Sequence, residues 1–148
     1  MSKEKGQVMR LYRFGNKCYK HHIPLLPGIV SRIIRVVFSC ELSCSTKIGK
    51  NTAFVHNGLG CVVNPDSIIG DNVRILQNVS IAGRGADRGT PIIEDDVLIG
   101  CGACILGGVR IGKGARIGAN AVVLTDIPEG GVAAGIPAKV VKINMAKD

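Results

Sequence analysis

His56 is the residue in this chain whose type and surroundings best suit acid–base chemistry. It is the only histidine outside the N-terminal segment, because His21 and His22 both precede Pro24. An imidazole titrates near neutral pH, so it can take the proton from a reacting hydroxyl. A lone histidine in a turn is also often simply exposed to solvent. The interpretation of His56 therefore depends on the elements that position it.

The chain around His56 follows a repeat of six residues. Isoleucine or valine recurs at this spacing from Val63 to Ile81 and from Ile93 to Val123. A period of six is neither helical nor a simple strand alternation. It predicts a coil with three flat sides, one for each six-residue unit. Each coil would bury its apolar residues only against its neighbours, so the coils are stable as a stack.

The period fails at two places. Between Phe54 and Val63 the spacing is nine, so three extra residues enter the segment around His56. The segment 82–91 is polar and rich in glycine, and it carries Asp87 where an apolar residue is expected. Irregular loops on a rigid scaffold usually carry function. We expect the two departures to lie near each other on the surface, or to face each other across neighbouring subunits.

The charge distribution limits the class of partner. The net charge is +8, and residues 1–50 account for all of it with ten basic and two acidic residues. Residues 51–148 hold nine of each sign. The repeat body therefore has no basic surface for nucleic acid. Aromatic residues make up only 3% of the chain, which leaves no stacking platform for single strands.

Two helices are expected before the repeat. Residues 6–22 would form the first, with Met9, Tyr12 and Tyr19 as buried points. Residues 28–39 would form the second, which is too short to span a bilayer. Its broad apolar face comprises Ile29, Ile33, Ile34, Val36 and Val37.

The second helix has two interpretations. In the favoured one, its apolar face packs on the first coil and covers the open end of the stack. In the other, Arg32 and Arg35 make it a basic amphipathic helix that touches an anionic membrane surface. The two are compatible if a basic face stays exposed.

The six cysteines are expected to be free thiols. The first fifteen residues are charged and lack an apolar core, so we expect a cytoplasmic protein, in peripheral contact with the inner face of the membrane if the helices bind there. Cys101 and Cys104 form a single CxxC pattern on repeat positions that small residues occupy elsewhere. A metal or redox role is therefore disfavoured, and no metal is expected.

The repeat resembles the hexapeptide-repeat acyltransferases, and most of all the serine acetyltransferases and their capsular polysaccharide O-acetyltransferase relatives. The resemblance covers about residues 41–142, in the stretches KIGKNTAFVHNGLGCVVNP, DNVRILQNVSIAGRG, IGCGACILGGVRIGKGARIGANAVVL and AAGIPAKVV. It implies an all-β fold, a left-handed parallel β-helix over residues 41–136. A short helical segment (1–40) would precede it and a basic tail (137–148) would follow. It also implies a homotrimer with active sites between subunits.

The resemblance implies a role for His56 as the general base that activates an acceptor hydroxyl toward acetyl-coenzyme A. Glu41 would be its partner carboxylate. In the serine acetyltransferases an acid precedes the catalytic histidine, and Val55 stands there in this chain. A basic residue and a second histidine correspond to Gly89 and Thr90. The groups that would hold an amino acid are thus mostly replaced.

Further site residues follow from the same resemblance. Gly83, Cys101 and Ala119 match positions along the pantetheine arm of the coenzyme, and Arg116 matches a basic position near its phosphates. Lys113 and Lys139 are phosphate candidates because of their charge. The acceptor would meet residues of the 82–91 loop, namely Arg84, Asp87, Arg88 and Thr90.

Four functions are weighed. The replaced residues favour an O-acetyltransferase acting on a neutral hydroxyl, such as a sugar in polysaccharide synthesis. The alternative is a serine O-acetyltransferase of cysteine biosynthesis without the large N-terminal helical domain. A zinc carbonic anhydrase with this fold needs three histidines, and the repeat body has only His56. A non-catalytic trimeric scaffold would not need the His56 turn.

Overall fold

The structure is a computed structural model that describes residues 6–85 and 89–144. Two helices open the chain, α1 (Gln7–Lys20) and α2 (Leu26–Phe38). A short 3-10 turn, η1 (Val55–Gly58), follows the second strand. The strands are β1 (Lys47–Ile48), β2 (Ala53–Phe54), β3 (Val62–Val63), β4 (Ile68–Ile69), β5 (Arg74–Ile75), β6 (Ser80–Ala82), β7 (Ile92–Ile93), β8 (Leu98–Ile99), β9 (Cys104–Leu106), β10 (Arg110–Ile111), β11 (Arg116–Ile117), β12 (Val122–Val123), β13 (Gly131–Gly135) and β14 (Ala138–Ile143).

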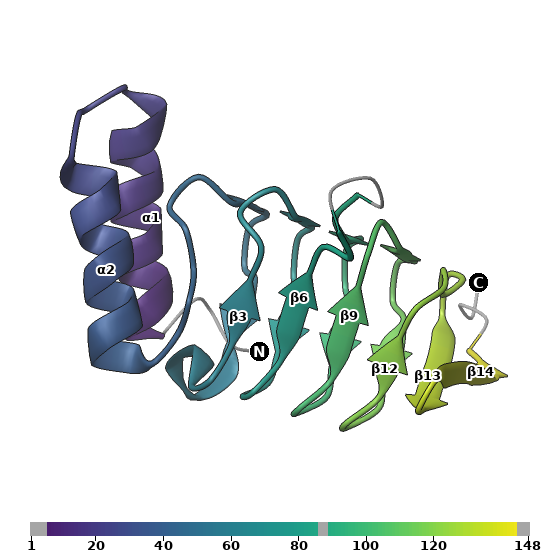
Figure 1. The fold of residues 1–148 in the computed structure, drawn as a ribbon. Helices are drawn as coiled ribbons and strands as arrows, with labels where there is room; N and C mark the ends of the chain where they lie inside the picture. The colour runs from purple at the N-terminus through teal and green to yellow at the C-terminus, as the bar shows by residue number, and fades with distance from the viewer. Residues whose placement is uncertain (1–5, 86–88, 145–148) are drawn as a thin grey trace.

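Consecutive strands of the repeat lie in three different sheets, and every third strand returns to the same sheet (Figure 1). The sheets are β1-β4-β7-β10, β3-β6-β9-β12 and β2-β5-β8-β11, the last extended by β13 and β14. Pairing in the coils is parallel and in register, so that Ile69 lies beside Ile93, and Ile93 beside Ile111. The predicted parallel β-helix of hexapeptide repeats is confirmed.

The interior of the stack is made by the six-residue repeat. The anchor residues from Phe54 to Val123 are at most 2% exposed. The small or β-branched residues four positions later are buried with them: Val73, Val79, Val97, Ala103, Val109, Ala115 and Ala121. Since strands expose alternate side chains on opposite faces, each short strand points one residue inward and one outward. The prediction of a narrow aliphatic core is therefore confirmed.

The turns between the sheets stack into three edges along the prism. We call the turns 55–61, 76–79, 100–103 and 118–121 the His56 edge, because His56 lies on the first of them. The loop edge comprises 64–67, 83–85, 89–91 and 107–109. The acidic edge comprises 49–52, 70–73, 94–97 and 112–115. The sheet β3-β6-β9-β12 separates the His56 edge from the loop edge.

Helix α1 covers the open end of the first coil. Met9 and Tyr12 are buried in the common core, and the Tyr12 hydroxyl donates a hydrogen bond to the carbonyl of Thr46. The prediction for Tyr19 was wrong, because its side chain is 51% exposed. Tyr19 lies two helical turns beyond Tyr12, where it lines a cavity of about 350 Å³ beside Lys47.

Helix α2 packs along α1. The expectation that the apolar face of α2 covers the open end of the stack was therefore wrong. Only Val30 and Ile34 are buried, because α1 already occupies the coil end. The helix touches the first coil at its margin, where the backbone N–H of Cys44 donates to the Ser31 hydroxyl at 3.0 Å. The other predicted face residues are exposed: Ile29, Ile33, Val36 and Val37. Within the described residues, no helix is long and apolar enough to cross a membrane.

The C-terminal residues continue the fold beyond the expected boundary at residue 136. The chain reverses after Gly135, and β14 pairs antiparallel with β13, with Ala138 beside Gly135 and Ile143 beside Gly131. Residues 138–143 are therefore a strand and not the start of a tail, and β14 becomes the last strand of its sheet.

Candidate functional site

The three extra residues around His56 are accommodated by η1, a tight turn of four residues at the start of the His56 edge. His56 and Asn57 both adopt left-handed backbone conformations, with φ of 55° and 56°. A left-handed backbone conformation costs a residue other than glycine roughly 1–2 kcal/mol. It therefore persists only where the surrounding contacts impose it. The His56 side chain is exposed on the outside of this turn.

The N-terminal elements hold the His56 turn from two sides. The first turn of α1 approaches it, and the backbone N–H of Val8 points at Asn57 Oδ1 at 3.5 Å. On the other side, the backbone N–H of Gly60 donates to Ser39 at 2.9 Å. Gly58 lies so close to Cys40 that an added Cβ would be 2.8 Å from its sulfur. Sequence analysis missed these supports, whose only trace is the Asn-Gly pair that follows His56.

Cys40 supports the turn by packing and not by reactivity. It is fully buried, and burial raises the pKa of its thiol to about 12, with a smaller contribution from Cys61. A thiol with so high a pKa stays protonated at neutral pH and is a poor nucleophile. Cys61 is also buried, and its pKa is raised for the same reason.

The carboxylate of Glu41 has Arg35, and not His56, as its partner among the described residues. Glu41 pairs with Val62 at the margin of the sheet β3-β6-β9-β12, and its carboxylate lies 3.8 Å from the guanidinium of Arg35. Within residues 6–85 and 89–144, no hydrogen bond or ion pair joins Glu41 to His56. Arg35 of α2 offers the carboxylate a cation, and nothing in the sequence indicates this contact.

Two of the predicted coenzyme residues share the His56 edge. Backbone hydrogen bonds run along this edge from turn to turn. Asn78 donates to Leu59 at 2.8 Å, Gly102 donates to Gln77 at 3.0 Å, and Asn120 donates to Cys101 at 2.8 Å. Cys101 is half-buried and Ala119, in the next coil, is exposed. A straight edge with small side chains therefore leads away from His56.

Arg116 and Lys139 lie beyond this edge, at the C-terminal end of the sheet that includes β11 and β14. Gly118 packs against Ala134, and Ala134 pairs with Lys139. Arg116 lies on β11 beside Val132 of the same strand β13. Both cations are exposed, and neither forms an ion pair within the part of the chain that the structure describes. The structure thus brings Arg116 and Lys139 near the end of the edge that carries Ala119.

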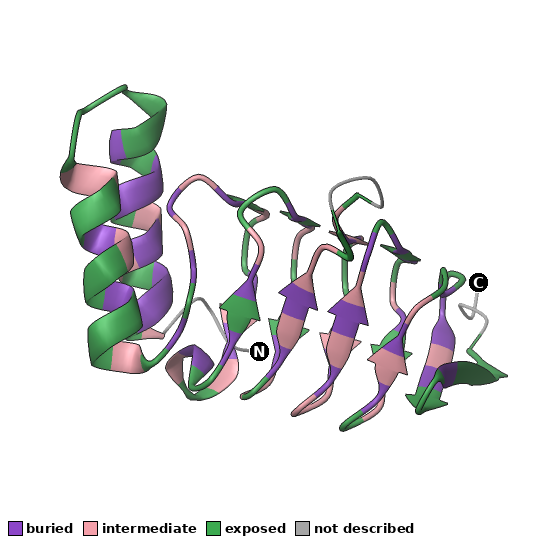
Figure 2. Cartoon of the chain, in the orientation of Figure 1, coloured by how far each residue is buried: buried purple, intermediate pink, exposed green. Residues whose placement is uncertain are grey.

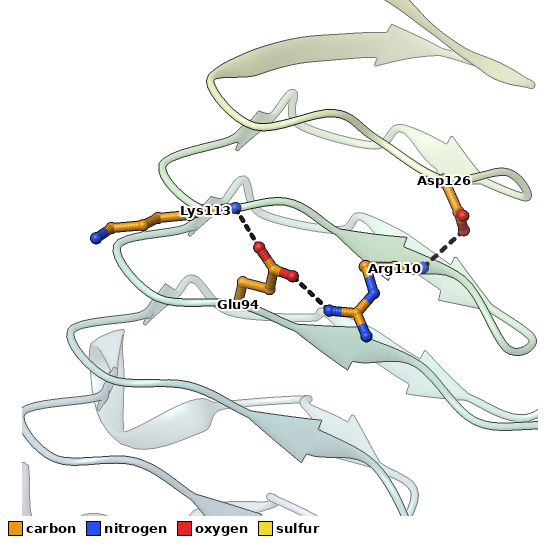
Figure 3. Close-up of polar contacts among 4 residues, drawn as sticks. All are labelled: Glu94, Arg110, Lys113 and Asp126. Carbon is orange, nitrogen blue, oxygen red and sulfur yellow. Dashed lines mark hydrogen bonds and ion pairs between the residues drawn. The ribbon is translucent and has the colours of Figure 1, made fainter. Parts of the chain in front are cut away.

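Lys113 does not join them, because it lies on the acidic edge (Figure 3). Its ammonium group is 4.0 Å from Asp96, and its backbone N–H donates to Glu94 at 2.9 Å. Glu94 also accepts a hydrogen bond from the Arg110 guanidinium, which holds the pKa of the carboxyl below its ordinary value. These contacts join successive coils, so Lys113 has a structural role that its charge alone did not reveal.

The remaining predicted residues that the structure describes lie on the loop edge. An added Cβ at Gly83 would lie 3.4 Å from the carbonyl oxygen of Gly89, and the Thr90 hydroxyl donates to the backbone of Asp66 at 3.1 Å. Arg84 is exposed. Two further predicted acceptor residues, Asp87 and Arg88, fall outside the described residues.

The two departures from the repeat lie on different edges of one chain. In Figure 1, η1 precedes β3 at one end of the sheet β3-β6-β9-β12, and residues 83–85 follow β6 at the other end. About six residues at about 3.3 Å each make this side on the order of 15–20 Å wide. Of the two arrangements expected, the one in which the departures are neighbours within one chain was therefore wrong, and the one in which they face each other across subunits stays a prediction. A site that uses both requires a second copy.

The CxxC pair shows no sign of a metal centre. Cys101 precedes and Cys104 begins β9, and both are partly exposed free thiols. Across the two described ranges, no group of three or more His, Cys, Asp or Glu side chains could hold a metal ion.

Comparison with known proteins shows a similarity to transferases. Residues 90–125 match the family model for the bacterial transferase hexapeptide (six repeats). The chain is 38% identical to a serine acetyltransferase of Bacillus pumilus over 138 residues, which is 92% of this chain and 63% of the relative.

Solved structures give the same likeness. A serine acetyltransferase in complex with CoA superposes with a TM-score of 0.82 at 38% identity, over 90% of this chain and 55% of that one. A serine acetyltransferase in complex with cysteine gives a TM-score of 0.85 at 36% identity, over 91% and 56%. This chain thus spans little more than half the length of the proteins it matches.

Proposed function

We infer that this chain is a hexapeptide-repeat transferase related to the serine acetyltransferases, and we propose that it transfers an acetyl group from acetyl-coenzyme A to an acceptor hydroxyl. The observation that carries the proposal is the His56 turn. Three residues are added to an otherwise regular coil, two of them are held at positive φ, and an exposed imidazole results. A stack that served only as a scaffold would have no use for this turn.

His56 would act as the general base. A hydroxyl attacks a thioester well only if its proton leaves as the new bond forms, and imidazole is suited to accept that proton. The attack forms a C–O bond and a tetrahedral oxyanion, which backbone N–H groups can stabilise. Collapse of this intermediate breaks the C–S bond, and the departing thiolate takes the proton from His56. The products are the acetyl ester and coenzyme A.

The His56 edge suits the donor. Its small residues let a pantetheine arm lie close to the backbone near Cys101 and Ala119. The exposed cations Arg116 and Lys139 lie at the far end of the edge. There they could form charge-assisted hydrogen bonds with the phosphate groups of the coenzyme. We therefore propose these four residues as coenzyme-binding residues of the chain that supplies His56, whereas Gly83 would contact the coenzyme from a neighbouring copy.

Serine is the acceptor that the relatives support best, since the named relatives are serine acetyltransferases. The polysaccharide acceptor expected from sequence has no such support. One observation still favours a neutral hydroxyl as the second candidate. Val55, Gly89 and Thr90 carry no charge, and the Thr90 hydroxyl is bound to the backbone of Asp66. These residues cannot pair with the carboxylate or the ammonium group of an amino acid.

The choice of acceptor is decided by measuring coenzyme A release with serine and with a panel of sugars and nucleotide sugars. With serine as acceptor, we expect a kcat of about 1–1,000 s⁻¹, the range of ordinary enzymes. Turnover with a sugar and none with serine would establish the second candidate. If neither serine nor any of the sugars supported coenzyme A release, O-acetyl transfer to these classes would be contradicted.

We further propose that the functional assembly is a homotrimer in which each site combines the His56 edge of one subunit with the loop edge of the next. The separation of the two edges within one chain supports this arrangement. A cytoplasmic location remains a prediction.

Mixed assemblies test the shared site. We expect His56→Asn and Gly83→Leu to be inactive alone, because the first removes the base and the second fills the coenzyme groove. When the two variants are unfolded and refolded together at equal amounts, about one quarter of the sites would combine both intact edges. Coenzyme A release should then return to about a quarter of the unmodified rate. A mixture that exchanges subunits and stays inactive would contradict a site shared between chains.

A further inference from the structure

Helix α2 carries an apolar stripe that no other part of the described chain covers. Leu25 is 83% exposed, Val36 81%, Val37 64%, Ile29 49% and Ile33 42%. In Figure 2, most of the outer surface of α2 is coloured as exposed. Single exposed apolar residues are ordinary, whereas a contiguous set indicates an interaction site.

The stripe is continuous around the helix. At 100° per residue, Ile29, Ile33, Val36 and Val37 fall within an arc of about 100°, and Leu25 directly precedes the helix. Val30 and Ile34 occupy the adjoining arc and are buried against α1. The helix thus has an apolar surface wider than its packing on α1 requires.

The N-terminal end of the stripe is hollowed. Ile23, Leu25 and Ile29 line an open groove of about 530 Å³, together with Pro27, Gly28 and the side chain of Arg32. The groove therefore combines an apolar floor with one cation at its margin.

The charges beside the stripe are positive. Arg32 is exposed at its border and lines the groove. Among residues 6–50 the only acid is Glu41, and its carboxylate already lies near Arg35. Two copies joined through this face would bring like charges together, which is unfavourable. An anionic surface would instead complement it.

We propose that α2 docks on an anionic lipid surface, with the stripe inserted among the headgroups and Arg32 directed to lipid phosphates. A helix of 13 residues cannot cross a bilayer, but it can lie in the interface with its apolar side buried. The docking surface is at the end of the prism that α1 and α2 cover, and it does not include the His56 edge. The inference therefore stands apart from the proposed acetyl transfer.

Vesicle sedimentation of the full chain tests the proposal. We expect binding to phosphatidylcholine vesicles that contain 30% phosphatidylglycerol, little binding to phosphatidylcholine alone, and weaker binding as salt rises. The double variant Val36→Ser and Val37→Ser should lower the partition coefficient about tenfold or more, because two apolar side chains no longer enter the interface. Arg32→Glu should lower it by a similar factor.

The matched control is Val141→Ser. Val141 is 67% exposed on β14, at the opposite end of the prism, so this variant should bind vesicles as the unmodified protein does. Thermal melts of all variants verify that each one is folded. Equal binding by all variants, or no binding to anionic vesicles, would overturn the proposal. It would also be overturned if the double variant lost only self-association in light scattering, since the occupant would then be a second copy.

Discussion

Replacing His56 with asparagine is expected to lower kcat/KM for acetyl transfer by about 10²–10⁴-fold, the usual contribution of a positioned general base. Asparagine tolerates the positive φ of 55° at this position better than alanine does. The substitution therefore removes the base and keeps the turn. Coenzyme A release with the acceptor that supports turnover is the measurement, and the KM for acetyl-coenzyme A should change little.

The exposed histidines of the N-terminal segment provide the control. His21→Asn and His22→Asn remove imidazoles that lie outside the His56 edge, and we expect full activity in both. Circular dichroism and the oligomeric state should be unchanged in all three variants. If His56→Asn retained more than about half of the activity while folded, His56 would not be the base.

Replacing Ile69 with alanine is expected to lower the free energy of unfolding by about 2–5 kcal/mol, as for other large-to-small changes in a core. Ile69 is 2% exposed and lies inside the stack on β4, between β1 and β7. Each coil is stabilised mainly by its neighbours, so a cavity in one coil weakens its contacts with both adjacent coils. Urea unfolding at one fixed protein concentration measures the change.

The neighbouring residue is a matched control. Ile68 has the same side chain on the same strand, but it points outward and is 41% exposed. Ile68→Ala should therefore cost less than about 1 kcal/mol, because little apolar area returns to water. Similar losses for the two variants would contradict the inward and outward assignment of these residues, and with it the period of six as the origin of the core.

Much of the fold could be predicted from the sequence because burial in a stack is a local property. The residues from Val63 to Val123 are spaced so that each anchor meets the anchor one coil away, and this pattern is written in the chain itself. The two interruptions, at 55–61 and 82–91, were identified for the same reason.

The site was predicted less completely. Cys101 and Ala119 lie on the edge that starts at His56, but Lys113 lies on the acidic edge beside Asp96. Charge identified the lysine as a phosphate candidate without revealing which side of the prism it occupies. Glu41 likewise lies near Arg35, on a helix whose position relative to the first coil the sequence did not reveal.

The sequence by itself determined the repeat, the aliphatic interior and the place where the regular coil is interrupted at His56. Only the tertiary structure decided which edges carry the two interruptions, and which helix covers the coil end. The outer face of α2 remains exposed because α1 covers the coil end, and Tyr19 remains exposed because it lies at the end of α1, where it lines the cavity beside Lys47. A periodic pattern shows that a face is apolar. The partner that buries this face depends on how all the elements fit together.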